Sequence, residues 1–160
     1  MKGWKKLLLS KTHIVVGGAF STTFTTLLNI ALKETQYNNM LPLNNLAIIT
    51  GSLLGAILPD IDHCESWVSQ TIPIKFYKIF KHRGITHNPL NILFFIAIAI
   101  YLKNYFLLGL AIGIFSHLAA DFQYSSTKNK FLKAQIEKVW FVFSWIVIAV
   151  TIILNIWRKI

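Results

Sequence analysis

Five apolar stretches constrain this chain more than any other feature of its sequence. They contain no Lys, Arg, Asp or Glu, and they cover residues 14–32, 46–59, 90–102, 105–120 and 139–157. A helix needs about 20 apolar residues to cross a bilayer, so the first and last stretches are long enough, whereas the middle three must recruit flanking residues or lie where the bilayer is thin. With 54% hydrophobic and 14% charged residues, the composition excludes a disordered chain and argues against a soluble globule. We therefore predict an all-α, polytopic membrane helical bundle with about five transmembrane helices, in a single domain over residues 1–160.

The positive charges are distributed unevenly between the apolar stretches. The chain has 16 Lys and Arg residues against six Asp and Glu, and 12 of the cations fall in residues 1–13, 60–89 and 121–138. Because cytoplasmic loops retain a positive excess, the N-terminus and the two long loops are predicted to be cytoplasmic. The same cations would attract anionic lipid headgroups. No nucleic acid is expected as a partner, because the cations are spread over membrane-flanking segments and no binding motif accompanies them.

Two segments beside the apolar stretches combine apolar and basic side chains. Residues 72–81 and 130–140 do so at near-helical spacing. This pattern predicts two amphipathic helices that lie on the membrane surface. Ordinary solvated connectors are the alternative for both segments.

Histidines and aspartates gather at the predicted helix ends. Ionisable residues near a bilayer are costly unless they are paired or functional, so their positions are informative. All of the following fall on the predicted cytoplasmic side: His13 at the start of the first stretch, Asp60, Asp62 and His63 after the second, His82 and His87 before the third, and His117 with Asp121 at the end of the fourth. This convergence predicts one shared site.

Each motif has a plain structural alternative when it is taken alone. His117 and Asp121 are four residues apart, so they share one helix face and could reach the same metal, but a helix-end hydrogen bond or a core histidine has the same spacing. Asp60 and Asp62 follow a proline, where Asx turns and capped helix ends are common. For His13, the alternative is an interfacial histidine without a ligand.

The segment from His82 to His87 suits a loop better than a helix, because its two histidines are five residues apart. Gly84 would let the backbone approach a bound oxyanion, and Arg83 could hold that oxyanion with two parallel hydrogen bonds. Asn88 is a suitable N-cap for the next helix, which would begin at the following proline. A solvated basic loop is the alternative.

Taken together, these eight histidines and aspartates predict a metal centre. Mixed imidazole and carboxylate ligands suit a divalent metal, with zinc preferred and manganese or iron(II) also compatible. Eight candidates exceed what one tetrahedral ion needs, so two ions are expected. Two divalent ions against three carboxylates would leave a positive pocket, which suits hydrolysis of a phosphoester. Cys64 is the single cysteine, so neither an internal disulfide nor a cysteine-based zinc site is expected.

Four motifs, in this order along the chain, resemble a known family. They are Thr12-His13, LPDIDH at 58–63, HRGITH at 82–87 and SHLAAD at 116–121. Over about residues 10–122 they resemble the bacterial YdjM-like family of membrane-bound proteins, which are labelled metal-dependent hydrolases. The resemblance implies a location in the bacterial cytoplasmic (inner) membrane. After Asp121 the family commonly continues with a Thr and a Gly-Pro stretch, whereas residues 122–126 are FQYSS here, so substrate contacts carried by that stretch are expected to differ.

A more distant likeness connects the same motifs to bacterial zinc-dependent phospholipases C. That likeness is an analogy of arrangement, and it implies that Asp60, His87, His117 and Asp121 are direct metal ligands. It also implies that the reaction is cleavage of a phosphoester.

These inferences lead to one functional hypothesis and one rival. A membrane-bound hydrolase would act on a membrane lipid or a lipid-linked substrate, and the rival is a non-catalytic scaffold or regulator in which the cluster binds one structural metal or forms a hydrogen-bonded network. In the hydrolase, Arg83 would hold the phosphate. The predicted metal ligands are Asp60, Asp62, His87, His117 and Asp121, and the additional ligands or acid/base groups are His13, His63 and His82.

Overall fold

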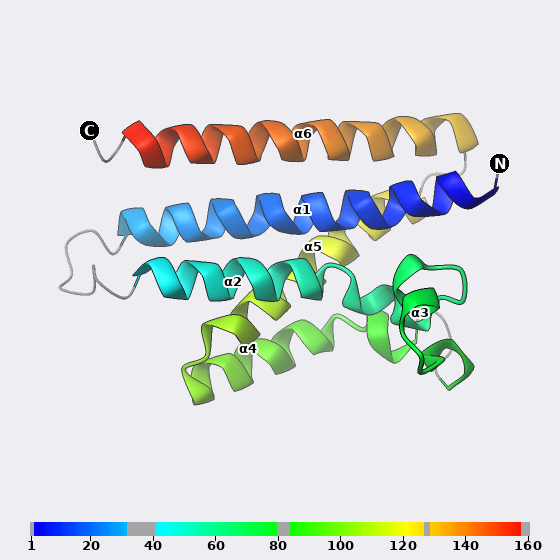
Figure 1. Cartoon of the computed structure of the whole chain (residues 1–160), viewed down its shortest axis with the longest axis horizontal. Coiled ribbons are helices and arrows are strands. Elements are labelled where there is room, and N and C mark those ends of the chain that lie inside the picture. Colours follow the sequence, from blue (N-terminus) through cyan, green and yellow to red (C-terminus); the bar gives the residue numbers. More distant parts are fainter. Residues whose placement is uncertain (1, 32–40, 80–83, 127–128, 158–160) are drawn as a thin grey trace.

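The computed structural model describes residues 2–31, 41–79, 84–126 and 129–157, and these residues form helices and connecting turns without any strand. The all-α prediction is therefore confirmed. The helices are α1 (Lys2–Ala31), α2 (Leu41–Gly55), η1 (Leu58–Asp62), α3 (Trp67–Thr71), η2 (Phe76–Lys78), η3 (Ile85–His87), α4 (Leu90–Leu102), α5 (Tyr105–Ser126) and α6 (Lys130–Trp157). Helix α1 packs against α2, α5 and α6, while α4 packs against α5 (Figure 1). The short helices gather at the end of the bundle where α1 begins (Figure 1).

Within the described residues, two helical segments are long and apolar enough to cross a membrane, namely Asn44–Asp62 and Tyr105–Phe122. Leu90–Leu102 and Lys138–Ile153 are apolar helices that are shorter than this. A membrane helical bundle is consistent with these lengths, and the number of five crossings stays a prediction.

The two segments predicted as surface helices differ from that prediction. The helix predicted over residues 72–81 does not form in the described part of that segment, residues 72–79. Pro73 holds the preceding Ile72 in an extended conformation (φ −78°, ψ 132°), and the single 3-10 turn η2 follows before residue 80, where the described range ends. Residues 130–140 are helical, but they continue into residues 141–157 as the single helix α6, so they do not form a separate helix. Asn88 is not the N-cap of the next helix, because α4 begins at Leu90 and its N-cap is Pro89, one residue later than expected. The Oδ1 of Asn88 nevertheless accepts the backbone N–H of Leu90 at 3.0 Å.

Helices α2 and α5 are held together by four glycines that leave no space for a side chain. A Cβ atom on Gly51, Gly55, Gly109 or Gly113 would lie 2.1–2.3 Å from a backbone oxygen of the opposite helix. Small residues spaced by four allow this close approach in membrane helices. On α5 the next two positions of the same spacing are His117 and Asp121, so the face that packs against α2 continues directly into the polar cluster.

Many side chains in the interior of the bundle are small or polar, besides a few apolar ones such as Ile48 and Ile114, while many large apolar side chains face outward. Ser21, Ser52 and Ser116 are fully buried, and Ser52 Oγ donates a hydrogen bond to the Gly17 carbonyl oxygen of α1 at 3.0 Å. Exposed large apolar residues include Leu93 and Phe94 of α4 and a series along α6 from Val139 to Ile153. Contiguous apolar surface on this scale would be a liability in water and is expected against lipid.

Candidate metal centre

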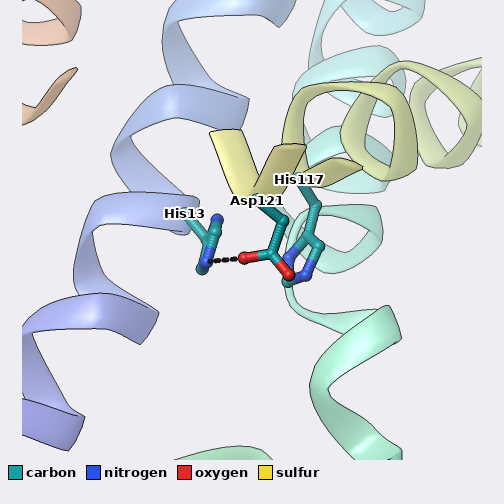
Figure 2. Close-up of side chains that lie close together, drawn as sticks. All are labelled: His13, His117 and Asp121. Carbon is teal, nitrogen blue, oxygen red and sulfur yellow. Dashed lines mark ion pairs between the residues drawn. The ribbon is translucent and has the colours of Figure 1, made fainter. Parts of the chain in front are cut away.

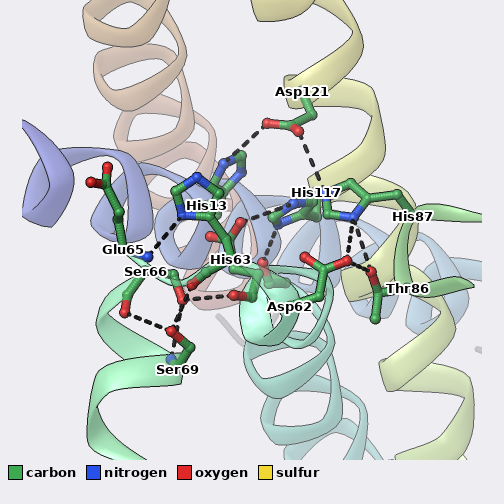
Figure 3. Close-up of polar contacts among 12 residues, drawn as sticks. His13, Asp62, His63, Glu65, Ser66, Ser69, Thr86, His87, His117 and Asp121 are labelled. Atoms are coloured by element: carbon green, nitrogen blue, oxygen red, sulfur yellow. Dashed lines mark hydrogen bonds and ion pairs between the residues drawn. The ribbon is translucent and has the colours of Figure 1, made fainter. Parts of the chain in front are cut away.

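Six of the predicted site residues meet at one end of the bundle, where four separate segments converge (Figure 3). All six are buried or half-buried, whereas Glu65, in the turn after η1, is exposed. His13 comes from α1, Asp60 and Asp62 from η1, His87 from η3, and His117 with Asp121 from α5. Helix α2 ends at Gly55, and the 3-10 helix η1 that follows has Pro59 in its first turn and buries both of its aspartates.

His117 is the centre of the cluster. Its side chain is fully buried, and its Nδ1 lies 2.7 Å from the carbonyl oxygen of Ala56. A carbonyl can only accept, so Nδ1 carries a proton and donates it, and in the neutral ring Nε2 keeps a lone pair. Within the described residues Nε2 makes no hydrogen bond, and it lies 3.8 Å from Asp60 Oδ1.

His13 stacks on His117, with ring centroids 4.0 Å apart and an angle of 26° between the ring planes. It is 3% exposed, and neither of its ring nitrogens has a hydrogen bond within the described residues. Its Nε2 lies 3.6 Å from Asp121 Oδ1 (Figure 2). Burying an imidazole without a hydrogen bond costs free energy, so we expect the ring nitrogens of His13 to bind a further partner.

Asp121 lies between two histidines. Its Oδ1 faces Nε2 of His13, and its Oδ2 lies 3.6 Å from Nε2 of His87 (Figure 3). The His87 and His117 rings also meet edge to face, with centroids 5.4 Å apart. Although His117 and Asp121 are neighbours on one helix face, each therefore faces partners from other segments.

The separations fit shared metal coordination better than direct hydrogen bonding. The nitrogen–oxygen distances of 3.6–3.8 Å are too long for hydrogen bonds. Two ligand atoms bound to one zinc ion at tetrahedral geometry lie roughly 3.3–3.6 Å apart. Ligand atoms of His13, His117 and Asp121 lie within 4.8 Å of one another, as do those of Asp60, His87 and His117. The donor set and its orphaned nitrogens therefore fit a divalent metal.

The remaining predicted residues stand apart from these two groups. Asp62 is 2% exposed and belongs to neither, since its Oδ2 faces the other side of the His87 ring, 3.7 Å from Nδ1. His63 lies beside the cluster, where its Nδ1 accepts the backbone N–H of Glu65 at 3.3 Å. His82 and Arg83 lie outside the described residues.

Sequence reasoning missed two features of the site. Thr86 donates a hydrogen bond to Asp62 and contacts His87, but a single threonine in a loop carries no signal that could have indicated this. The glycines at positions 51, 55, 109 and 113 do carry one, because two GxxxG motifs in apolar stretches indicate close helix packing. That packing places Ala56 against His117.

Fold and site together define a helical protein with an outward-facing apolar surface and a buried His/Asp cluster. The profile of the YdjM inner membrane protein family matches residues 8–159, so the chain belongs to this family. The inner membrane protein YdjM of Escherichia coli (strain K12) is 36% identical over 87 residues, covering 46% of this chain and 43% of the relative, and that of Shigella flexneri matches to the same extent. The chain thus spans less than half the length of these curated relatives. No solved structure matches it significantly. The predicted family resemblance is confirmed, and it supports membrane localisation.

Proposed function

We propose that this chain is a membrane-bound, metal-dependent hydrolase that cleaves a phosphoester of a lipid or a lipid-linked substrate. It would form a single domain over residues 1–160 in the bacterial cytoplasmic membrane, with its N-terminus and its site on the cytoplasmic side. Membership of the YdjM family supports a location in the membrane, and the His/Asp cluster supports the binding of a metal.

One observation carries the proposal. Nε2 of His117 is fully buried, has a lone pair fixed by the hydrogen bond at Nδ1, and lies opposite the carboxylate of Asp60. A lone pair and a carboxylate repel each other unless a cation stands between them. In the neutral ring Nε2 has no proton to offer that carboxylate, so a metal ion is the cation that this geometry favours.

The proposed ligands are His13, Asp60, His87, His117 and Asp121. They supply three imidazoles and two carboxylates, which suit zinc first and manganese or iron(II) next. Asp121 presents one oxygen to His13 and the other to His87, so a carboxylate is available on both sides of the cluster. This arrangement supports two ions.

Divalent ions in this cluster would supply Lewis acidity to a phosphoester oxygen and make water a stronger nucleophile. Side chains of the protein would donate the proton to the leaving group and hold the phosphate. With Nδ1 of His63 accepting a backbone N–H, its proton stays on Nε2, which makes it a proton donor for a leaving oxygen. Arg83 would hold the phosphate through its planar guanidinium.

A lipid substrate is favoured by the apolar surface beside the cluster. Leu58 and Ile85 are 39% and 66% exposed, and they belong to η1 and η3, the short segments that carry Asp60, Asp62 and His87. Trp67, which is 47% exposed, begins α3, and α3 packs against η1. Apolar side chains next to an interfacial polar site are expected to contact the glycerol and upper acyl region of a lipid. A headgroup phosphate would then lie close to the cluster.

The test combines metal analysis with turnover. Purified wild-type protein is expected to hold about two divalent ions and to release phosphate or a phosphorylated headgroup from a panel of phospholipids and lipid phosphates. Asp121→Asn is expected to lose metal and turnover together, whereas Glu65→Gln, the same change on an exposed acid outside the cluster, is expected to retain both. A folded wild-type protein that binds no metal would contradict the proposal.

The rival function, a scaffold or regulator with a structural metal, is favoured by one observation. His117 is 0% exposed and His13 only 3%, which also suits an ion that no substrate reaches. In that case the protein would hold at most one ion and release nothing from any lipid in the panel. Removing the metal would then lower the thermal stability of a protein that has no turnover with or without the ion.

A further inference from the structure

A short chain of polar contacts leads from His87 away from the proposed metal ligands. Thr86 Oγ1 donates a hydrogen bond to Oδ2 of Asp62 and lies 3.1 Å from Nδ1 of His87 (Figure 3). Asp62 is 2% exposed, and its Oδ2 lies 3.7 Å from the same ring nitrogen. The three residues come from η1 and η3, which pack against each other.

The hydrogen-bond donors and acceptors of these three residues fix the tautomer of His87. A threonine hydroxyl has one proton, and the Asp62 carboxylate can only accept it. Thr86 Oγ1 must therefore accept at its contact with His87, so Nδ1 of His87 carries a proton and donates it. In the neutral ring, Nε2 then keeps a lone pair.

That lone pair points into the cluster. Nε2 of His87 lies 3.6 Å from Asp121 Oδ2, and a ligand atom of His87 lies within 4.8 Å of ligand atoms of Asp60 and His117. His117 is fixed in the same way, with the Ala56 carbonyl in place of the threonine. Two histidines from different segments are thus held in one tautomer by acceptors on their outer sides.

We propose that Thr86 and Asp62 are positioning residues, which together hold the His87 ring so that its Nε2 lone pair faces a bound divalent metal. The inference rests on the proposed function for the metal, and it gives Asp62 a role behind a ligand instead of the ligand role predicted from sequence. A carboxylate behind a ligating histidine orients the ring and increases its basicity, and loss of such partners costs about 10–100-fold in metal affinity.

Metal affinity is the first measurement. Zinc dissociation constants are determined in detergent by competition with a chromophoric chelator, and cobalt(II) spectra report the ligand geometry. Thr86→Val keeps the shape but removes the hydroxyl, so its affinity is expected to fall about 10–100-fold, while Thr86→Ser is expected to stay within about threefold of wild type. Thr50→Val is the matched control, because Thr50 is exposed on α2 and its hydroxyl bonds only its own helix.

Stoichiometry separates a positioning role from a ligand role for Asp62. At saturating zinc, Asp62→Asn is expected to hold as many ions as wild type but with lower affinity. Loss of one ion in Asp62→Asn, together with unchanged affinity in Thr86→Val, would show that Asp62 is a ligand and would overturn the inference.

The tautomer of His87 is the second measurement, and it needs no metal. In metal-free protein, ¹⁵N chemical shifts of the His87 ring, assigned by their loss in His87→Gln, are expected to show a protonated Nδ1 and an unprotonated Nε2. Thr86→Val should give a mixture of tautomers. An unprotonated Nδ1 in wild type would overturn the positioning role, whereas the expected tautomer in a protein that binds no metal would contradict the proposed function alone.

Discussion

Substituting Gly113 by alanine tests whether the close packing of α2 and α5 supports the site. The added Cβ would lie 2.1 Å from the Ser52 carbonyl oxygen and 2.6 Å from the backbone nitrogen of Ala56. Contacts of this kind need at least 3.4 Å, so the two helices must separate by roughly 1 Å. The displaced residue, Ala56, carries the carbonyl that fixes His117.

The expected magnitude follows from two opposing effects. Alanine in a helix interior gains about 0.5–1 kcal/mol over glycine, while overpacking against backbone atoms costs about 1–3 kcal/mol and here cannot be relieved by rotating a side chain. We therefore expect Gly113→Ala to lower the free energy of unfolding by about 1–2 kcal/mol. Its zinc affinity should fall about tenfold as the bond from His117 to Ala56 lengthens.

Gly18→Ala is the matched control, because its Cβ would lie 3.6 Å from Leu53 Cδ2 and 3.7 Å from Ile148 Cδ1, which are ordinary contacts. This variant should be as stable as wild type or slightly more stable. Thermal unfolding in detergent and zinc competition are measured on both proteins. Equal stability and equal zinc affinity of the two variants would refute the argument that the α2–α5 contact positions His117.

Three further predictions follow from the site and the charge distribution. Chelation of the metal is expected to lower the Tm of wild type but not of His117→Ala, because an ion at 100 times its Kd stabilises the folded state by about 2.7 kcal/mol; equal shifts would argue against binding through His117. Arg83→Lys is expected to keep the metal and to lower turnover about 10–100-fold, or about 1.4–2.8 kcal/mol, so a loss of metal would contradict its role at the phosphate. In a Cys64→Ser background, single cysteines at positions 38 and 126 are expected to label from opposite sides of the membrane, and labelling from one side would disprove the predicted topology.

The fold class was accessible from sequence because apolar stretches without charge leave few alternatives to membrane helices. The boundaries were less accessible. Helix α6 continues through residues 130–140 because nothing in that segment stops a helix, although its mixed charge resembles a surface segment. Pro73 does stop one, and giving it more weight would have excluded a helix over residues 72–81.

The site could be predicted in part from the sequence, because an apolar chain has few ionisable residues and their positions relative to the apolar stretches are easy to identify. The histidines and aspartates at helix ends could be grouped by topology alone. Their individual roles could not, because a pattern in one segment does not reveal the atoms that face it from another. Asp62 had the same local signal as Asp60, and only the packing of η1 against η3 separates them by placing Thr86 at Asp62.

The HxxxD spacing on α5 shows why local geometry was not enough. His117 and Asp121 share a face, and their ligand atoms lie within 4.8 Å of each other, as expected for residues that could reach the same metal. Their ion-pair contacts differ, however, because His117 faces Asp60 while Asp121 faces His13 and His87. Each of these three ion-pair contacts therefore joins α5 to another segment. A metal bound there would link α1, η1, η3 and α5, so its binding energy would contribute directly to tertiary stability. The glycine face of α5 complements this arrangement, because it brings α5 close to α2 and to Ala56, just before η1, where Asp60 faces His117.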